Sequence, residues 1–76
     1  MTRALTAGQR IASWRRLRGW SVRYLAKRAG LHFPAVSRME KGHQEPKAEE
    51  VERIATSLGL TMPQFYGDLA ENAKAS

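Results

Sequence analysis

Apolar residues recur along this chain at the spacing of α-helices, in five short segments separated by glycine and proline. Ile11 and Trp14 share one stripe in the first segment, and Val51, Ile54 and Leu58 share another in the fourth. No segment alternates apolar and polar residues as a half-buried strand would. The pattern predicts an all-α chain with helices at residues 6–18, 21–29, 33–41 and 47–58, and a short fifth helix that begins at Thr61 and contains Met62, Phe65 and Tyr66.

Residues typical of helix ends flank these segments. Thr6, Ser21 and Thr61 have side-chain oxygens that can accept a hydrogen bond from a first-turn N–H group. Pro34 has no N–H to donate, so it is expected in the first turn of the third helix. The expected helix stops are the glycines at 19, 30, 42 and 59.

The stretch from Ser21 to Glu40 has the residue types that a helix-turn-helix requires, because its two short helices cross closely and at a steep angle. Ala26 is small enough for the point of closest approach, and Gly30, four residues later, suits a sharp turn. The inner face of the second helix needs apolar residues, which are Leu31, Val36 and Met39. The spacing of these apolar residues predicts that the outer face of helix 33–41 is polar and exposed.

Charge is divided unevenly along the 76 residues, whose net charge is +6 and whose pI is about 10.6. Residues 1–43 carry ten lysines and arginines and a single acid, Glu40, whereas residues 44–76 carry three bases and six acids. A polyanion-binding surface requires such segregation of positive charge. The length predicts one domain over residues 1–76, with an ordered core at about 6–69 and a frayed tail at 71–76.

The span from Gly8 to Tyr66 resembles the lambda-repressor-like, Cro-type helix-turn-helix family. The resemblance rests on four segments, GQRIASWRRLRGWS, YLAKRAGL, VSRMEKG and PKAEEVERIATSLGL. It implies a five-helix DNA-binding domain whose helices 2 and 3 form the helix-turn-helix. It also implies binding to operator DNA, usually as a dimer, with helix 33–41 as the recognition helix in the major groove.

The residues expected to contact bases lie at the start and on the outer face of that helix: His32, Phe33, Pro34, Ser37 and Arg38. Arg38 suits bidentate pairing with O6 and N7 of guanine. Phe33 and Pro34 depart from the polar residues that the family often has there. Either they contact thymine methyl groups, or Phe33 turns into the core and Pro34 only starts the helix; the sequence leaves both open.

Two groups of residues are expected to contact phosphates on either side of the recognition helix: Ser21, Val22 and Arg23 before it, and Lys41, His43, Gln44 and Lys47 after it. Val22 replaces a glutamine common in the family, so only its backbone N–H is available. The other front-half bases, Arg10, Arg18, Lys27 and Arg28, are expected to contribute a general positive field rather than contacts.

Arg15 and Glu40 are expected to form an ion pair between the first and third helices. Arg15 lies four residues after Ile11, and Glu40 lies four residues after Val36, so both lie beside apolar stripes. A partly buried guanidinium needs a carboxylate, and Glu40 is the only acid among residues 1–43. Members of the family that resemble this chain have such a pair.

The last apolar residues, Leu60, Met62, Phe65, Tyr66 and Leu69, exceed what a small core absorbs, so we expect them to form a homodimer interface. The alternative is that they cover the domain's own core. A two-fold axis would place two recognition helices about 34 Å apart and predicts a palindromic operator.

Other chemistries have little support. Cysteine is absent, and His32 and His43 are not accompanied by ligands at metal spacing, so neither a metal nor a cofactor is expected. The sequence contains no catalytic motif, so enzymatic activity is not expected. Neither a signal peptide nor an apolar run of 18 residues occurs, so the expected location is the cytoplasm, without membrane contact.

The expected function is that of a small transcriptional regulator: a phage-type repressor, a restriction-modification controller or an antitoxin. A partner protein such as a toxin is compatible with this expectation, and the sequence does not identify one. The alternative is a protein-interaction module that uses an exposed Phe33 to bind another protein.

Overall fold

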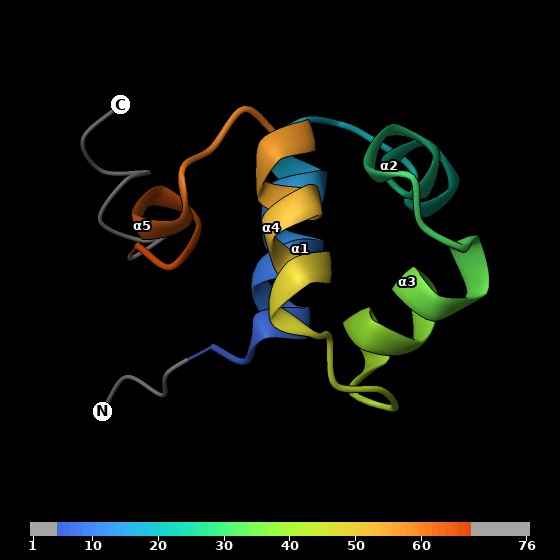
Figure 1. Cartoon of the computed structure of the whole chain (residues 1–76). Helices are drawn as coiled ribbons and strands as arrows, with labels where there is room; N and C mark the ends of the chain where they lie inside the picture. The colour runs from blue at the N-terminus through green and yellow to red at the C-terminus, as the bar shows by residue number, and fades with distance from the viewer. Residues whose placement is uncertain (1–4, 68–76) are drawn as a thin grey trace.

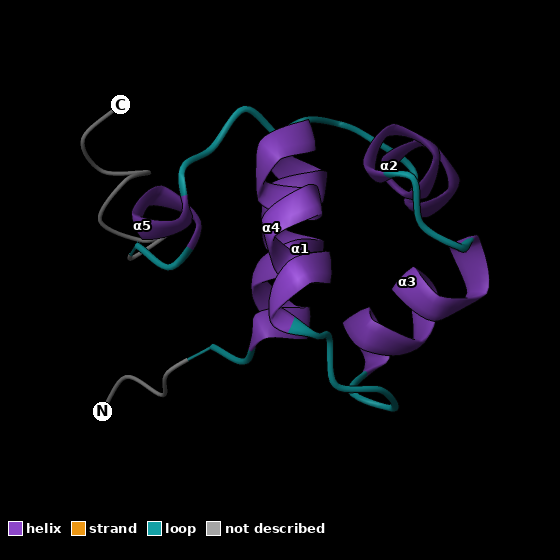
Figure 2. Cartoon of the chain, viewed as in Figure 1, coloured by secondary structure: helices purple, strands orange, loops and turns teal. Residues whose placement is uncertain are grey.

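The computed structural model describes residues 5–67, and every regular element in this part of the chain is a helix (Figures 1 and 2). The all-α prediction is confirmed. Leu69 and the tail at 71–76 lie outside the described residues. The helices are α1 (Ala7–Leu17), α2 (Val22–Ala29), α3 (Phe33–Lys41), α4 (Ala48–Ser57) and α5 (Met62–Phe65).

Three of the five helices, α1, α2 and α5, begin at side chains that the sequence offers as caps, whereas the N-cap residues of α3 and α4 make no side-chain cap bond. Thr6 Oγ1 accepts a hydrogen bond from Gln9 N at 3.1 Å, and the Gln9 side chain accepts one from Thr6 N at 2.9 Å. This reciprocal capping box satisfies N–H groups that have no partner within the helix. Ser21 caps α2 through a bond from Tyr24 N at 3.0 Å, and Thr61 with Gln64 repeats the capping box at α5.

The turn between α2 and α3 depends on Gly30. Its φ of 70° lies in the left-handed region, where a Cβ atom is disfavoured. Leu31 N donates to Ala26 O at 2.9 Å, which closes the end of α2 and directs the chain into α3 two residues later. In Figure 1, α2 and α3 lie together on one side of α4, and α5 lies on the other side.

One apolar core joins all five helices. It includes the residues that the helical periodicity places inward, with Val36 and Met39 binding α3 to it at 0% and 1% exposure. Its members are Ile11, Trp14, Leu25, Ala26, Ala29, Val36, Met39, Val51, Ile54, Ala55, Leu58 and Phe65. Phe65 is fully buried, so its assignment to a dimer surface is wrong: the chain's own core takes up this ring.

α1 and α3 approach so closely at Gly8 that no side chain fits between them. A Cβ atom built on Gly8 would overlap the backbone carbonyl of Met39. Gly8 is buried in the first turn of α1, and Met39 lies on the inner face of α3. The position of the candidate recognition helix is therefore set partly by a backbone contact with α1.

Two side chains of α1 and that of Arg18, its C-cap residue, donate hydrogen bonds to backbone carbonyl groups between Leu58 and Gly67. Arg10 Nη1 donates to Gly67 O at 2.7 Å, Trp14 Nε1 donates to Phe65 O at 3.0 Å, and Arg18 Nη2 donates to Leu58 O at 2.7 Å. Hydrogen bonds from a charged donor are stronger than those between neutral groups. Arg10 and Arg18, expected only to contribute positive charge, thus also fasten the fold together.

Candidate nucleic-acid interface

α3 has a buried face and an exposed face, and the exposed face carries the residues expected to meet DNA. While Val36 and Met39 are buried, Arg38 and Lys41 project from the other side of the helix into solvent. His32 and Pro34 are exposed at its N-terminal end, and Ser37 is half-buried. Figure 1 shows α3 at the edge of the molecule, where a long ligand can reach it.

Although it is exposed, the Arg38 side chain makes a hydrogen bond to a neighbouring residue. Its Nε donates to Gln44 Oε1 at 2.9 Å, so the last turn of α3 is linked to the loop that follows. Lys41, His43 and Lys47 are exposed along the same part of the chain, whereas Gln44 is half-buried. The loop thus supplies several donors beside the end of α3, as expected for phosphate contacts.

Phe33 turns partly inward. Its ring is half-buried and packs against the core, and the Arg23 guanidinium lies over it with its Cζ atom 4.3 Å from the ring centroid. This distance is well inside the range of attractive cation–π contacts. Of the two alternatives for Phe33, the structure therefore favours packing, with Pro34 exposed beside it in the first turn of α3.

The N-terminal turn of α2 lies next to α3 through this Arg23–Phe33 contact. Ser21 is exposed, Val22 is half-buried against the core, and Arg23 is exposed. Backbone N–H groups in the first turn of a helix have no acceptor within the helix, so they are available to an anion. The three residues expected at a phosphate are thus placed together with a fixed cation.

Glu40 does not weaken the positive potential of this part of the chain, because Arg15 neutralises it. Arg15 Nε and Nη2 donate to the two carboxylate oxygens at 2.7 and 2.9 Å, and Arg15 Nη1 donates to Trp20 O at 2.8 Å. The side chains of Arg15 and Glu40 are 13% and 9% exposed. The hydrogen bonds to Glu40 raise the pKa of Arg15 by more than burial lowers it. The ion pair is bidentate and joins α1 to α3.

The sequence matches a known family. A family model described as helix-turn-helix matches residues 11–65, which run from within α1 to the end of α5 and make up most of the chain. The chain belongs to the lambda-repressor-like, Cro-type helix-turn-helix family. This helix-turn-helix protein is a DNA-binding transcription regulator in general terms, as the family is. Searches of curated proteins and of solved structures gave no match.

The helix-turn-helix protein also has an aromatic and cationic stripe along α2 that the helical periodicity did not reveal. Trp20 and Tyr24 make an edge-to-face contact with ring centroids 4.9 Å apart. The Cζ atom of Arg28 lies 5.6 Å from the Trp20 ring and 5.9 Å from the Tyr24 ring. Tyr24 and Arg28 lie four residues apart on one face of α2, and Trp20, which precedes the helix, packs beside them.

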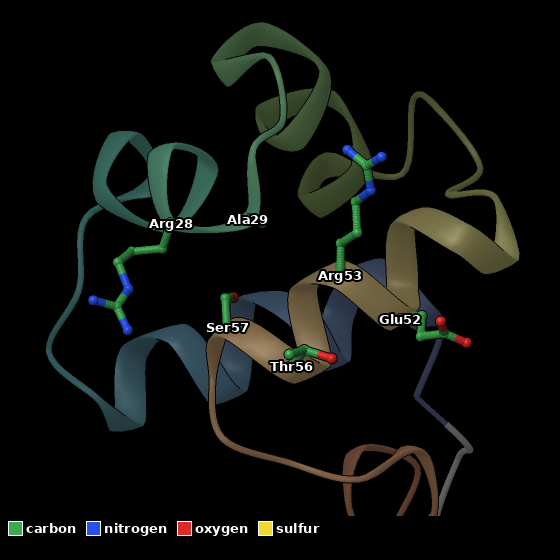
Figure 3. A pocket seen from close by; sticks show the side chains of 6 residues that line it. All are labelled: Arg28, Ala29, Glu52, Arg53, Thr56 and Ser57. Carbon is green, nitrogen blue, oxygen red and sulfur yellow. The ribbon is translucent and has the colours of Figure 1, made fainter.

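A shallow hollow of about 320 Å³ lies between α2 and α4 of the helix-turn-helix domain (Figure 3). It is lined by Arg28, Ala29, Glu52, Arg53, Thr56 and Ser57. Figure 3 shows the guanidinium groups of Arg28 and Arg53 directed away from each other, so they do not converge on one anion. Ser57 Oγ is engaged with Ile54 O at 2.7 Å. We therefore leave this hollow out of the candidate interface.

The described residues contain neither a cluster of metal-binding side chains nor a helix that could cross a membrane. Across residues 5–67, no three side chains of histidine, cysteine, aspartate or glutamate are grouped to hold a metal ion. Within those same residues, every helix is too short and too polar to cross a bilayer.

Proposed function

We propose that this protein binds a specific duplex DNA sequence by inserting α3 into the major groove, and so acts as a small transcriptional regulator. The observation that carries the proposal is the two-sided character of α3. Val36 and Met39 fix one side in the core, and the other side exposes hydrogen-bonding and cationic groups on a nine-residue helix. The major groove of B-DNA admits an α-helix presented in this way.

Base recognition in this proposal centres on Arg38, whose guanidinium can donate two parallel hydrogen bonds to guanine O6 and N7. Ser37 and His32 are further polar groups at the same helix, and Pro34 can contact a thymine methyl group. Phe33 has a smaller role at the bases, because its ring packs on the core and supports Arg23.

Phosphate contacts on either side of α3 would fix the orientation of the helix in the groove. On the α2 side we assign the hydroxyl of Ser21, the backbone N–H of Val22 and the guanidinium of Arg23. On the loop side the exposed bases are Lys41, His43 and Lys47. These groups supply charge and donors without distinguishing bases, so they determine affinity and its salt dependence.

We further propose that the protein acts as a homodimer through Tyr66 and the neighbouring Leu60 and Met62. Tyr66 is 47% exposed, and Leu60 and Met62 are half-buried against the core, so each retains some free surface. An isologous contact there would relate two copies of α3 by a two-fold axis. A palindromic operator follows, which fits a phage-type repressor, a restriction-modification controller or an antitoxin.

The proposal is tested by selecting bound sequences from random duplex DNA and measuring the affinity of the selected site against salt. We expect a palindromic site bound in the nanomolar range at low salt, with affinity falling steeply as salt rises. Weak binding that is the same for every sequence would contradict the proposal.

A protein-interaction module is not supported by a specific observation. That alternative depended on an exposed Phe33, and the ring is instead half-buried with Arg23 over it.

A further inference from the structure

We propose that Gln44 is a specificity-determining residue, which acts by positioning the side chain of Arg38 to recognise one base pair. The inference rests on the proposed function, because it takes α3 as the helix that enters the groove. It is carried by the hydrogen bond from Arg38 Nε to Gln44 Oε1 at 2.9 Å. The sequence suggested that Gln44 contacts a phosphate. In this proposal it instead positions Arg38, which contacts the base.

The backbone brings these two side chains together through the turn that ends α3. Gly42 has a φ of 81°, a left-handed conformation that glycine adopts at little cost. After this turn His43 N donates to Arg38 O at 2.9 Å, so the loop folds back over the last turn of the helix. This places Gln44 next to Arg38.

The two residues differ in exposure. Gln44 is half-buried, whereas Arg38 is exposed. The bond itself is exposed, so Arg38 stays accessible to DNA while its bond to the less exposed Gln44 restricts the conformations of its side chain.

The remaining donors of Arg38 suit guanine. A guanidinium has five N–H groups in a fixed plane, and the bond to Gln44 occupies the one on Nε. The four on Nη1 and Nη2 have no acceptor among residues 5–67, and two of them can donate to O6 and N7. Because Arg38 is oriented before DNA arrives, less conformational entropy is lost on binding. Gln44 thus increases discrimination at one base pair without touching DNA.

A phosphate contact by Gln44 would have a different effect. It would strengthen binding to every sequence by the same factor, since phosphates are alike along the duplex. The two roles are therefore separated by measuring discrimination at each base pair rather than affinity for a single site.

The test uses the operator recovered from random duplex DNA, together with a set in which each base pair of that operator is replaced in turn. Affinities are compared for the wild type, Arg38→Ala, Gln44→Ala, Gln44→Glu and the double variant Arg38→Ala with Gln44→Ala. Lys41→Ala serves as a control, because Lys41 is an exposed cation of the same helix. Circular dichroism establishes that each variant is folded.

We expect Gln44→Ala to reduce discrimination by about three- to tenfold at the base pair that Arg38→Ala also affects, and nowhere else; fixing one flexible side chain in advance accounts for this range. Gln44→Glu keeps an acceptor oxygen, so it retains discrimination there while its charge weakens binding to all sequences. The double variant should discriminate no less than Arg38→Ala alone. Lys41→Ala should weaken binding to all sequences equally.

Three results would overturn the inference alone: wild-type discrimination in Gln44→Ala at the base pair that Arg38 recognises, an equal loss at all base pairs in Gln44→Ala, or unchanged discrimination at every base pair in Arg38→Ala. Failure of the proposed function looks different, because then the wild type selects no operator. That result overturns both proposals.

Discussion

At the scale of single residues, Glu40 is the exception to the positive charge of the front half of the chain. As the only acid among residues 1–43, it would oppose a polyanion if it were free. Arg15 instead holds both of its carboxylate oxygens at the junction of α1 and α3. One ion pair therefore stabilises the packing of α3 and removes a repulsive charge from DNA.

Glu40→Ala should lower the free energy of unfolding by about 3 kcal/mol, because it leaves the mostly buried Arg15 without a carboxylate. We expect the lower end of the range for buried pairs, since Arg15 keeps its bond to Trp20 O. Urea denaturation followed by tryptophan fluorescence measures the change. Glu45→Ala is the matched control: Glu45 is exposed, so its removal should change stability by less than about 0.5 kcal/mol. Equal stabilities of the two variants would contradict the role given to the pair.

The difference between wild type and Glu40→Ala should not depend on the titration of Arg15 between about pH 6 and pH 9. A raised folded-state pKa gives stabilisation that is complete below the unfolded-state pKa and is lost only as pH rises through the higher folded value. For arginine both values lie far above this window. Denaturation curves across the window check the point, and a steady loss of the difference toward pH 9 would contradict it.

Arg23→Ala should lower the slope of log affinity against log salt by about one, because we propose that Arg23, whose guanidinium lies over the Phe33 ring, contacts a phosphate. Arg16→Ala removes the same charge from an exposed position on α1 outside the candidate interface. Titrations of operator DNA at several salt concentrations compare the two. A slope change in Arg16→Ala as large as that in Arg23→Ala would show that only net charge matters.

At the scale of elements, the contact between α1 and α3 should make alanine at position 8 destabilising, although helix propensity alone predicts that it stabilises. Alanine in place of a helical glycine usually stabilises a helix by about 0.5 to 1 kcal/mol. In Gly8→Ala the new methyl group would overlap the Met39 carbonyl, which is backbone and cannot rotate away. We expect a loss of about 2 to 3 kcal/mol as the helices separate. Thermal unfolding shows whether the substitution raises or lowers stability, and a variant more stable than wild type would contradict this packing.

Local features made most of the elements predictable. Caps such as Ser21 and the turn at Gly30 act within a few residues, and helical spacing identifies inward residues such as Val36, so the helix ends and core followed from the sequence. Phe65 was misassigned because periodicity shows that a residue is apolar but not which surface covers it. The close approach at Gly8 also depends on a helix 31 residues away, and local sequence does not encode it.

The sequence could propose residues for the candidate interface, but it could not predict the contacts among them. Charge and the resemblance pointed to Arg38, Arg23 and Gln44. Their pairing, with Arg38 bound to Gln44 and Arg23 stacked on Phe33, depends on how the turns orient side chains in three dimensions. Likewise Arg10 bonds to Gly67 across the fold, and nothing near Arg10 in the sequence indicates this acceptor.

At the scale of the whole molecule, the proposed dimer brings two copies of α3 to one operator. Tyr66→Glu should weaken self-association by placing a charge in the contact, and the fold should survive because Tyr66 is 47% exposed. Sedimentation equilibrium compares it with Tyr24→Glu, which changes a tyrosine of similar exposure on α2. Equal association constants for the two variants would exclude Tyr66 from the interface.

Interference by base methylation tests the central claim, that α3 recognises DNA in the major groove, most directly. Methyl groups are placed on guanine N7 in the major groove or on adenine N3 in the minor groove of the selected operator, and binding of the wild-type protein is measured. We expect N7 methylation within each half-site to prevent binding and N3 methylation to leave it intact. Binding that tolerates N7 methylation throughout the site and is lost on N3 methylation would contradict it.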